Sequence, residues 1–210
     1  MVFGLGSTGG KNRRVLADID YYPTTNELFE MINSYEGSYK TNKDFYQTRD
    51  KALASILYLG QLRRSEVHRL IKEQFKEDPF RIVAVKLSKS QKTNRKTGEV
   101  ITRKDAYRKE IPIPLKGTLG KLGQFVQDYL PFIDEKDRLF PFSDKAGRVD
   151  QIIKEMLGVP PHWERAFGEN MLYELFDNDL IAVANHVQVD PRTLAKYIHR
   201  TPEKYLKKLR

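Results

Sequence analysis

The chain has 210 residues, a length that fits one medium-sized domain with a short appendage. Hydrophobic residues make up 40% of it and charged residues 31%, which excludes collagen-like, low-complexity and wholly disordered chains. Because the chain contains no cysteine, disulfide scaffolds, thiolate metal sites and cysteine nucleophiles are excluded as well.

The charge balance favours a polyanionic partner. Lysine and arginine number 37 against 28 acidic residues, which gives a formal net charge of +9, and a basic surface attracts nucleic acid. A basic protein without such a partner fits the charge equally well. No apolar run reaches the ~20 residues of a membrane span, and the N-terminus lacks the apolar stretch of a signal peptide. We therefore expect a cytoplasmic protein with no membrane contact.

Residues 1–22 are expected to be a flexible basic leader, and residues 23–210 the folded part. The leader contains Gly4, Gly6 and Gly9 at the spacing of a dinucleotide-binding loop. That loop needs a strand before it and a helix after it, and only three residues precede Gly4. No nucleotide cofactor is therefore expected.

Helical patterns open the folded part. Apolar residues recur with helical spacing after Pro23, where Thr24 or Thr25 can act as the N-cap, and Gly37 closes this unit. Two more helices are expected before any strand, one over residues 49–59 and one, after Gly60, through residues 67–71.

Two strands are expected next, over residues 80–87 and 107–115, because both segments contain β-branched residues with partial alternation. The basic residues 88–106 between them predict a solvated hairpin tip, or an arm that contacts phosphate. Further helices are expected over residues 119–132, 149–157, 162–176, 179–185 and 191–198. This order predicts an α+β fold that is mainly α, with a β-hairpin or small antiparallel sheet between two helical parts.

Three motifs contain residue types that suit phosphate chemistry. In the first, RDKALASILYLGQLRRSEVHRL over residues 49–70, an apolar helix meets a glycine break and Arg63 opens the next helix. The second is HWER, residues 162–165, whose spacing puts its histidine and arginine on one helix face, where both can bind one phosphate. The third is DPRTLAKYIH, residues 190–199, which contains Tyr197.

On these motifs the chain resembles the catalytic domain of the tyrosine recombinases, the phage-type integrase family. The motifs come in the order of that family, and the predicted strand pair lies between the first and the second. We do not expect the family's separate N-terminal DNA-clamping domain, because only 62 residues precede Arg63. The sequence departs from the family pattern at Gly60, one residue earlier than the usual glycine, and at Ala166, where the family often has histidine.

The resemblance implies a catalytic site drawn from all three motifs. Arg63 and Arg165 take the positions of two catalytic arginines, and Glu66 a supporting position. His162 would bind the phosphate or assist proton transfer, and Tyr197 takes the position of the nucleophile.

The hairpin is implied to supply a lysine as general acid. Lys92 fits this role best, with Lys89 and Lys96 as alternatives. The last histidine position of the family falls on His186 or Gln188, of which we favour His186. Other basic residues are expected to contact DNA, namely Lys89, Arg95, Lys96, Arg64 and Arg192.

The chemistry of these residue types suits strand transfer at a DNA phosphodiester. Two guanidinium groups can hold the negative charge that develops on the non-bridging oxygens. A tyrosine can attack phosphorus and conserve the energy of the phosphodiester bond in a 3′-phosphotyrosyl ester. No acidic cluster has metal-ligand spacing, so neither a metal nor another cofactor is expected. The resemblance further implies double-stranded DNA as the partner and a tetramer assembled on it.

A non-catalytic DNA-binding protein is the alternative interpretation. Residues 179–198 can form a helix-turn-helix, in which Tyr197 would pack or touch DNA without reacting. Such a protein requires neither Arg63 nor the second motif, and so these features favour the recombinase.

Overall fold

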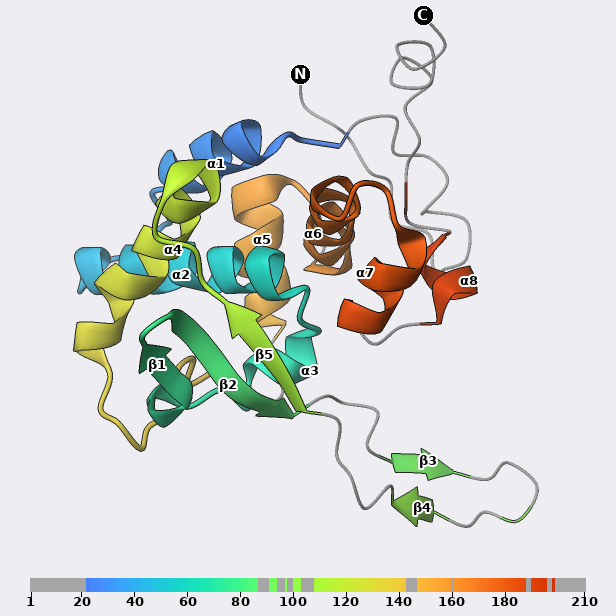
Figure 1. Cartoon of the computed structure of the whole chain (residues 1–210). Helices are drawn as coiled ribbons and strands as arrows, with labels where there is room; N and C mark the ends of the chain where they lie inside the picture. Colours follow the sequence, from blue (N-terminus) through green and yellow to red (C-terminus); the bar gives the residue numbers. More distant parts are fainter. Residues whose placement is uncertain are drawn as a thin grey trace, which may run out of the picture.

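The computed structural model of the chain describes residues 22–86, 91–93, 97, 100–102, 108–142, 147–159, 161–187, 190–195 and 198, and the structural statements below concern these residues. Its helices are α1 (Thr25–Asn33), α2 (Lys43–Gly60), α3 (Arg64–Val67), α4 (Gly117–Tyr129), α5 (Arg148–Leu157), α6 (Pro161–Leu175), α7 (Leu180–Val187) and α8 (Pro191–Leu194), with 3-10 turns at Lys72–Gln74 and Leu130–Phe132. Its strands are β1 (Phe75–Glu77), β2 (Phe80–Lys86), β3 (Gln91–Thr93), β4 (Val100–Thr102) and β5 (Arg108–Pro112). The predicted order of helices, strands and helices is confirmed (Figure 1).

The first helix begins at a reciprocal cap. The Thr24 N–H donates to Glu27 Oε2 at 2.8 Å, and the Glu27 N–H donates to Thr24 Oγ1 at 3.3 Å. Each bond satisfies a donor that the first turn leaves without a partner. Of the two predicted caps, Thr24 is therefore the one used, and α1 buries Leu28 and Ile32.

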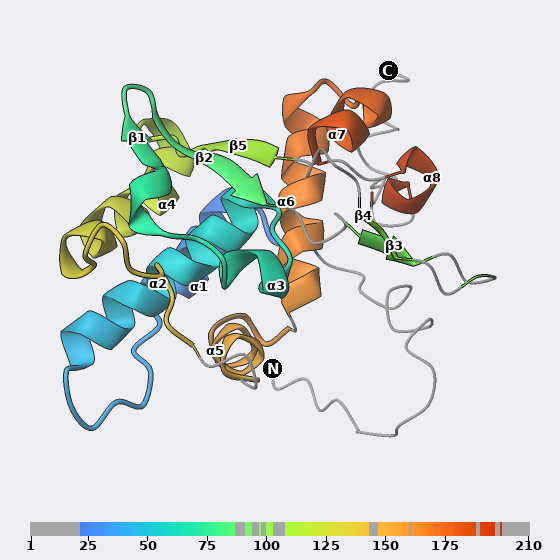
Figure 2. The same cartoon turned by 90° about the horizontal axis from the view of Figure 1, so that it is seen from below.

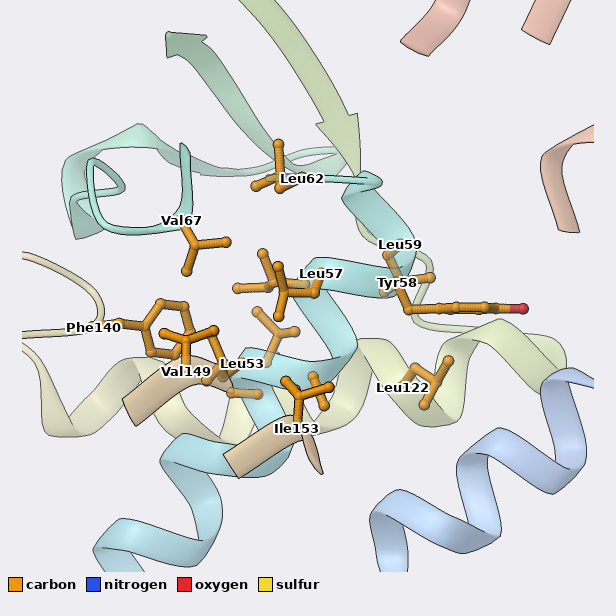
Figure 3. Close-up of a cluster of buried hydrophobic side chains, with 14 of the residues drawn as sticks. Leu53, Leu57, Tyr58, Leu59, Leu62, Val67, Leu122, Phe140, Val149 and Ile153 are labelled. Carbon is orange, nitrogen blue, oxygen red and sulfur yellow. The ribbon is translucent and has the colours of Figure 1, made fainter. Parts of the chain in front are cut away.

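Helix α2 is the centre of the fold. Every residue from Ala52 to Gly60 is buried, as the apolar composition of this segment requires. In Figure 1 the helix lies between α1 above it and the sheet below it. Figure 3 shows side chains from α2, α3, α4 and α5 that meet in one core cluster, among them Leu53, Val67, Leu122 and Ile153.

The Arg49-Asp50 pair of the first motif is structural. Both side chains are buried, and Arg49 Nη2 lies 2.8 Å from Asp50 Oδ1. Asp50 also accepts a bond from the Tyr39 hydroxyl, and the guanidinium lies over the rings of Tyr46 and Phe142. These contacts fasten the loop before α2 to the helix, which begins at Lys43, earlier than predicted.

The strands form two antiparallel groups. The larger sheet has the order β1-β2-β5, with Ile82 paired to Ile111 and a register shift between Ile82 and Val85. The two predicted strands thus pair with each other, whereas β1 at the edge was not predicted. β3 and β4 pair separately within the segment predicted as a hairpin tip, with Lys92 opposite Ile101.

The third helix is shorter than predicted. α3 ends at Val67, and Ile71, expected to be helical, instead forms an isolated antiparallel bridge with Arg138. The Leu70 carbonyl accepts from the Leu139 N–H at 2.8 Å. The N–H groups of residues 68–70 still make turn bonds to residues 64, 66 and 67. Pairing with the segment after α4 takes the place of a further helical turn beyond Leu70.

The C-terminal helices pack on one end of α6. Leu172, Val183, Val187 and Leu194 form a small hydrophobic cluster of their own, apart from the main core. Among the described helices, none is long and apolar enough to cross a bilayer.

Candidate active site

The turn that leads to Arg63 depends on Gln61. This residue follows α2 in the left-handed conformation, with φ 46° and ψ 40°. Its side-chain amide donates to the carbonyl oxygens of Tyr58 at 2.8 Å and Leu59 at 2.7 Å. Glycine adopts this conformation most easily, and Gln61 stands directly before Leu62-Arg63, where the recombinase pattern has its glycine. The side-chain bonds hold the turn in place of a glycine.

Arg63 is held by Glu66. The Arg63 main-chain N–H donates to Glu66 Oε2 at 2.8 Å, and Arg63 Nη1 donates to Glu66 Oε1 at 2.9 Å. The Arg63 side chain is 31% exposed and that of Glu66 only 1%. A buried carboxylate thus fixes the guanidinium, which keeps enough exposure to bind an anion.

Arg165 is held in a similar way by an acid that the sequence analysis missed. Its Nε donates to Glu169 Oε1 at 2.7 Å, and the two side chains are 12% and 4% exposed. Both residues lie on α6, four positions apart, a spacing that puts them on one helix face. That spacing was visible in the sequence, but an exposed i,i+4 pair has the same pattern. The burial of Glu169 distinguishes this pair.

Gly168 brings the two arginine-bearing segments together. A Cβ atom at Gly168 would lie 2.3 Å from the Tyr58 carbonyl oxygen and 3.2 Å from Gln61 Cγ. Gln61 precedes Arg63 by two residues, and Arg165 precedes Gly168 by three. The first and second motifs therefore meet where α6 crosses the end of α2.

Glu164, between the histidine and the arginine of the second motif, is fully buried. Neither of its carboxyl oxygens has a hydrogen-bond partner among the described groups. Burial raises the pKa of this carboxyl well above its usual value, because the charged form is poorly solvated there. Its neutral form is therefore favoured.

The structure describes only some of the remaining predicted site residues. His162 lies in α6 and Lys92 in β3, but their side chains lie outside the described part of the structure. The His186 ring lies 5.8 Å from that of Phe176, centroid to centroid, beside the end of α6. Tyr197, Gln188, Lys89, Arg95 and Lys96 lie outside the described residues.

The two described residues predicted to contact DNA have local partners. Arg64 forms an ion pair with Asp150 of α5, in which both side chains are about half exposed. Arg192 is exposed in α8. The Arg192 main-chain N–H donates to Asp190 Oδ1 at 2.8 Å, and this bond caps the first turn of the helix. Their DNA contacts stay predictions.

The strands β3–β4 of the basic segment and helix α8 of the third motif lie on one side of the molecule. In Figures 1 and 2, β3–β4 and α8 both lie at the right, next to the end of the molecule formed by α6 and α7. A hollow of about 650 Å³ lies elsewhere, between β1 and the end of α4, and none of its lining residues belongs to the motifs. Among the described residues, no group of three or more histidine and acidic side chains could hold a metal ion.

The fold of this chain resembles that of several solved structures. Three of the solved structures that match are of a site-specific recombinase and a transposon integrase. No protein-family model and no curated protein sequence matches the chain.

Two of the structures are of the XerH site-specific recombinase. The post-cleavage complex with palindromic difH substrate matches at 14% identity and a TM-score of 0.58, over 88% of this chain and 50% of that one. The pre-cleavage complex matches at 15% identity and a TM-score of 0.55, over 88% of this chain and 51% of that one. The chain spans about half the length of XerH.

The third structure is the Tn1549 transposon integrase in complex with a circular intermediate DNA. It matches at 16% identity and a TM-score of 0.53, over 91% of this chain and 67% of that one. The chain therefore has the fold of the tyrosine recombinase catalytic domain, as the three motifs predicted.

Proposed function

We propose that this chain is a site-specific DNA recombinase or integrase that cuts and rejoins DNA through Tyr197. The observation that supports this best is the pair of arginines, each held by its own buried carboxylate on segments that meet at Gly168. Two guanidinium groups, each fixed by a carboxylate, suit a phosphodiester in its transition state, where charge grows on the non-bridging oxygens.

In the cleavage step, the Tyr197 oxygen forms a bond to phosphorus as its hydroxyl proton passes to water, and the bond from phosphorus to the 5′-oxygen breaks. The products are a 3′-phosphotyrosyl ester and a free 5′-hydroxyl, whose proton comes from Lys92. Attack by a 5′-hydroxyl reverses the step and rejoins a strand. The reaction needs no metal, because Arg63 and Arg165 supply the positive charge that a metal ion would otherwise supply.

His162 and His186 would bind the phosphate or assist proton transfer in this scheme. XerH and the Tn1549 integrase are both described as complexes with DNA, which supports double-stranded DNA as the partner. We also propose that the chain assembles on DNA as a tetramer, so that two sites can exchange strands.

The test compares the wild type with Tyr197→Phe on labelled and supercoiled DNA in EDTA. We expect a protein-linked band on a denaturing gel and plasmid relaxation from the wild type, and neither from the variant. Tyr173→Phe, a tyrosine outside the three motifs, serves as the control and should react like the wild type. Salt-sensitive binding without adduct or relaxation, on DNA selected for binding, would favour the non-catalytic alternative.

A further inference from the structure

We infer that Glu169 is a positioning residue for Arg165, which holds the Nε edge of the guanidinium so that the two Nη groups meet the scissile phosphate. The inference rests on the proposed function and adds a residue that none of the three motifs contains. Glu169 itself does not touch the phosphate in this arrangement.

The position of Glu169 is fixed by its own helix. Residues 166–169 of α6 are all buried, so the acid cannot swing away from Arg165 without disturbing the packing. The crossing at Gly168, the residue directly before Glu169, holds the same turn of α6 against α2. A carboxylate on so rigid a support transmits that rigidity to the guanidinium it binds.

The edge of the Arg165 guanidinium formed by its two Nη groups stays available for a phosphate. A guanidinium has five N–H donors in one plane, and Glu169 takes the one on Nε. Among the described residues, no other acidic group pairs with Arg165. The two Nη groups can therefore form parallel bonds to two oxygens of one phosphate.

The first arginine uses a different edge. Glu66 takes Nη1 of Arg63, which leaves Nε and Nη2 as its available pair. Each carboxylate thus selects which edge of its arginine faces the phosphate. A carboxylate that only stabilised α6 would not need to orient the arginine. An experiment can therefore separate stabilising α6 from positioning Arg165.

The experiment uses four variants of the full chain. Glu169→Leu removes both the charge and the acceptor, and Glu169→Gln keeps an oxygen acceptor for the Nε–H. Glu164→Gln is the matched control, because Glu164 is a buried carboxyl on the same helix with no hydrogen-bond partner among the described groups. Arg165→Lys assigns the Arg165 signal in spectra of protein labelled with ¹⁵N-arginine.

The first readout is NMR of the Arg165 Nε–H, with and without orthovanadate as the phosphate probe. We expect a sharp, exchange-protected signal in the wild type and in Glu164→Gln, and its loss in Glu169→Leu. Vanadate should shift the Nη signals of Arg165 in the wild type and in Glu164→Gln, where the Nε is held, and not in Glu169→Leu. An unchanged Nε signal in folded Glu169→Leu would overturn the inference.

The second readout is single-turnover cleavage of DNA at a temperature at which every variant is folded. We expect Glu169→Leu to lower the cleavage rate by about 100-fold with an unchanged Kd for DNA, and Glu169→Gln to restore most of it. A lower melting temperature with a normal cleavage rate would show that Glu169 only stabilises α6, and would overturn the inference.

Two further outcomes are decided by the same measurements. If Glu169→Leu does not fold, Glu169→Ala takes its place, since it also removes the acceptor. A lost Nε signal with slower cleavage then supports positioning, and wild-type values of both oppose it. If even the wild type cleaves no DNA, the proposed function fails. The vanadate response then decides alone, because loss of the response in Glu169→Leu supports positioning and its persistence opposes it.

Discussion

Gly168 of α6 lies against the main chain of Tyr58 in α2, so closely that an added Cβ atom would be 2.3 Å from the Tyr58 carbonyl oxygen. Main-chain atoms cannot move aside as the end of a flexible side chain can. The helix crossing itself therefore requires glycine here. Since Arg165 and the turn before Arg63 both lie beside this crossing, it sets how the two arginines stand relative to each other.

Gly168→Ala is expected to lower the free energy of unfolding by about 1–3 kcal/mol and to slow DNA cleavage. Overpacking outweighs the ~1 kcal/mol that alanine gains in helix propensity. Urea unfolding and single-turnover cleavage measure the two effects. Gly147→Ala is the control, because its Cβ would meet nothing within 4 Å. A Gly168→Ala protein as stable as the wild type would contradict the close crossing.

Gln61 allows a test of how the turn before Arg63 is held. Gln61→Ala removes two side-chain bonds and keeps the left-handed conformation, so we expect a loss of about 1–3 kcal/mol in unfolding free energy. Gln61→Gly loses the same bonds but removes the ~1 kcal/mol strain of that conformation, so it should be more stable than the alanine variant. Equal stability of the two variants would argue against the left-handed turn.

Glu164 makes stability depend on pH. Its pKa is raised in the folded state, so the folded protein binds more protons than the unfolded one above the usual pKa of about 4.5. Stability contributed by this group therefore falls as pH rises above that value, by up to ~1.4 kcal/mol per pH unit. Glu164→Gln should remove this part of the slope and be more stable than the wild type at pH 7–8. Parallel pH profiles in urea unfolding would show that the carboxyl is solvated.

Arg63→Ala and Arg165→Ala should each slow DNA cleavage by about 100-fold or more, because each guanidinium stabilises charge mainly in the transition state. Lysine at either position should restore little, since it lacks the planar fork. Lys43→Ala, which breaks a surface ion pair with Glu36, is the control and should cleave normally. Near-normal cleavage by either arginine variant would remove that residue from the site.

DNA binding should weaken steeply with salt, because a chain of net charge +9 binds phosphates by releasing counterions. The slope of log Kobs against log salt concentration, measured by fluorescence anisotropy, should be the same for the wild type and Tyr197→Phe. A slope near zero would argue against a phosphate-dominated interface.

The sequence by itself determined the features that depend on neighbours along the chain. A cap at Thr24 or Thr25, the buried run of α2 and the strands β2 and β5 follow from local spacing, and so do the three motifs with Arg63 and Arg165. These signals are local because capping bonds, helical periodicity and alternation all join residues a few positions apart.

The tertiary structure alone decided which of these residues are buried together. Glu169 has the spacing of any surface ion pair, and only packing around α6 turns it into a buried partner of Arg165. Likewise α3 ends at Val67 because Leu70 and Ile71 pair with the segment at Arg138 and Leu139, far along the chain. Contacts between distant segments leave no periodic trace in the sequence, so the geometry of the two arginines became visible only where α2 and α6 cross.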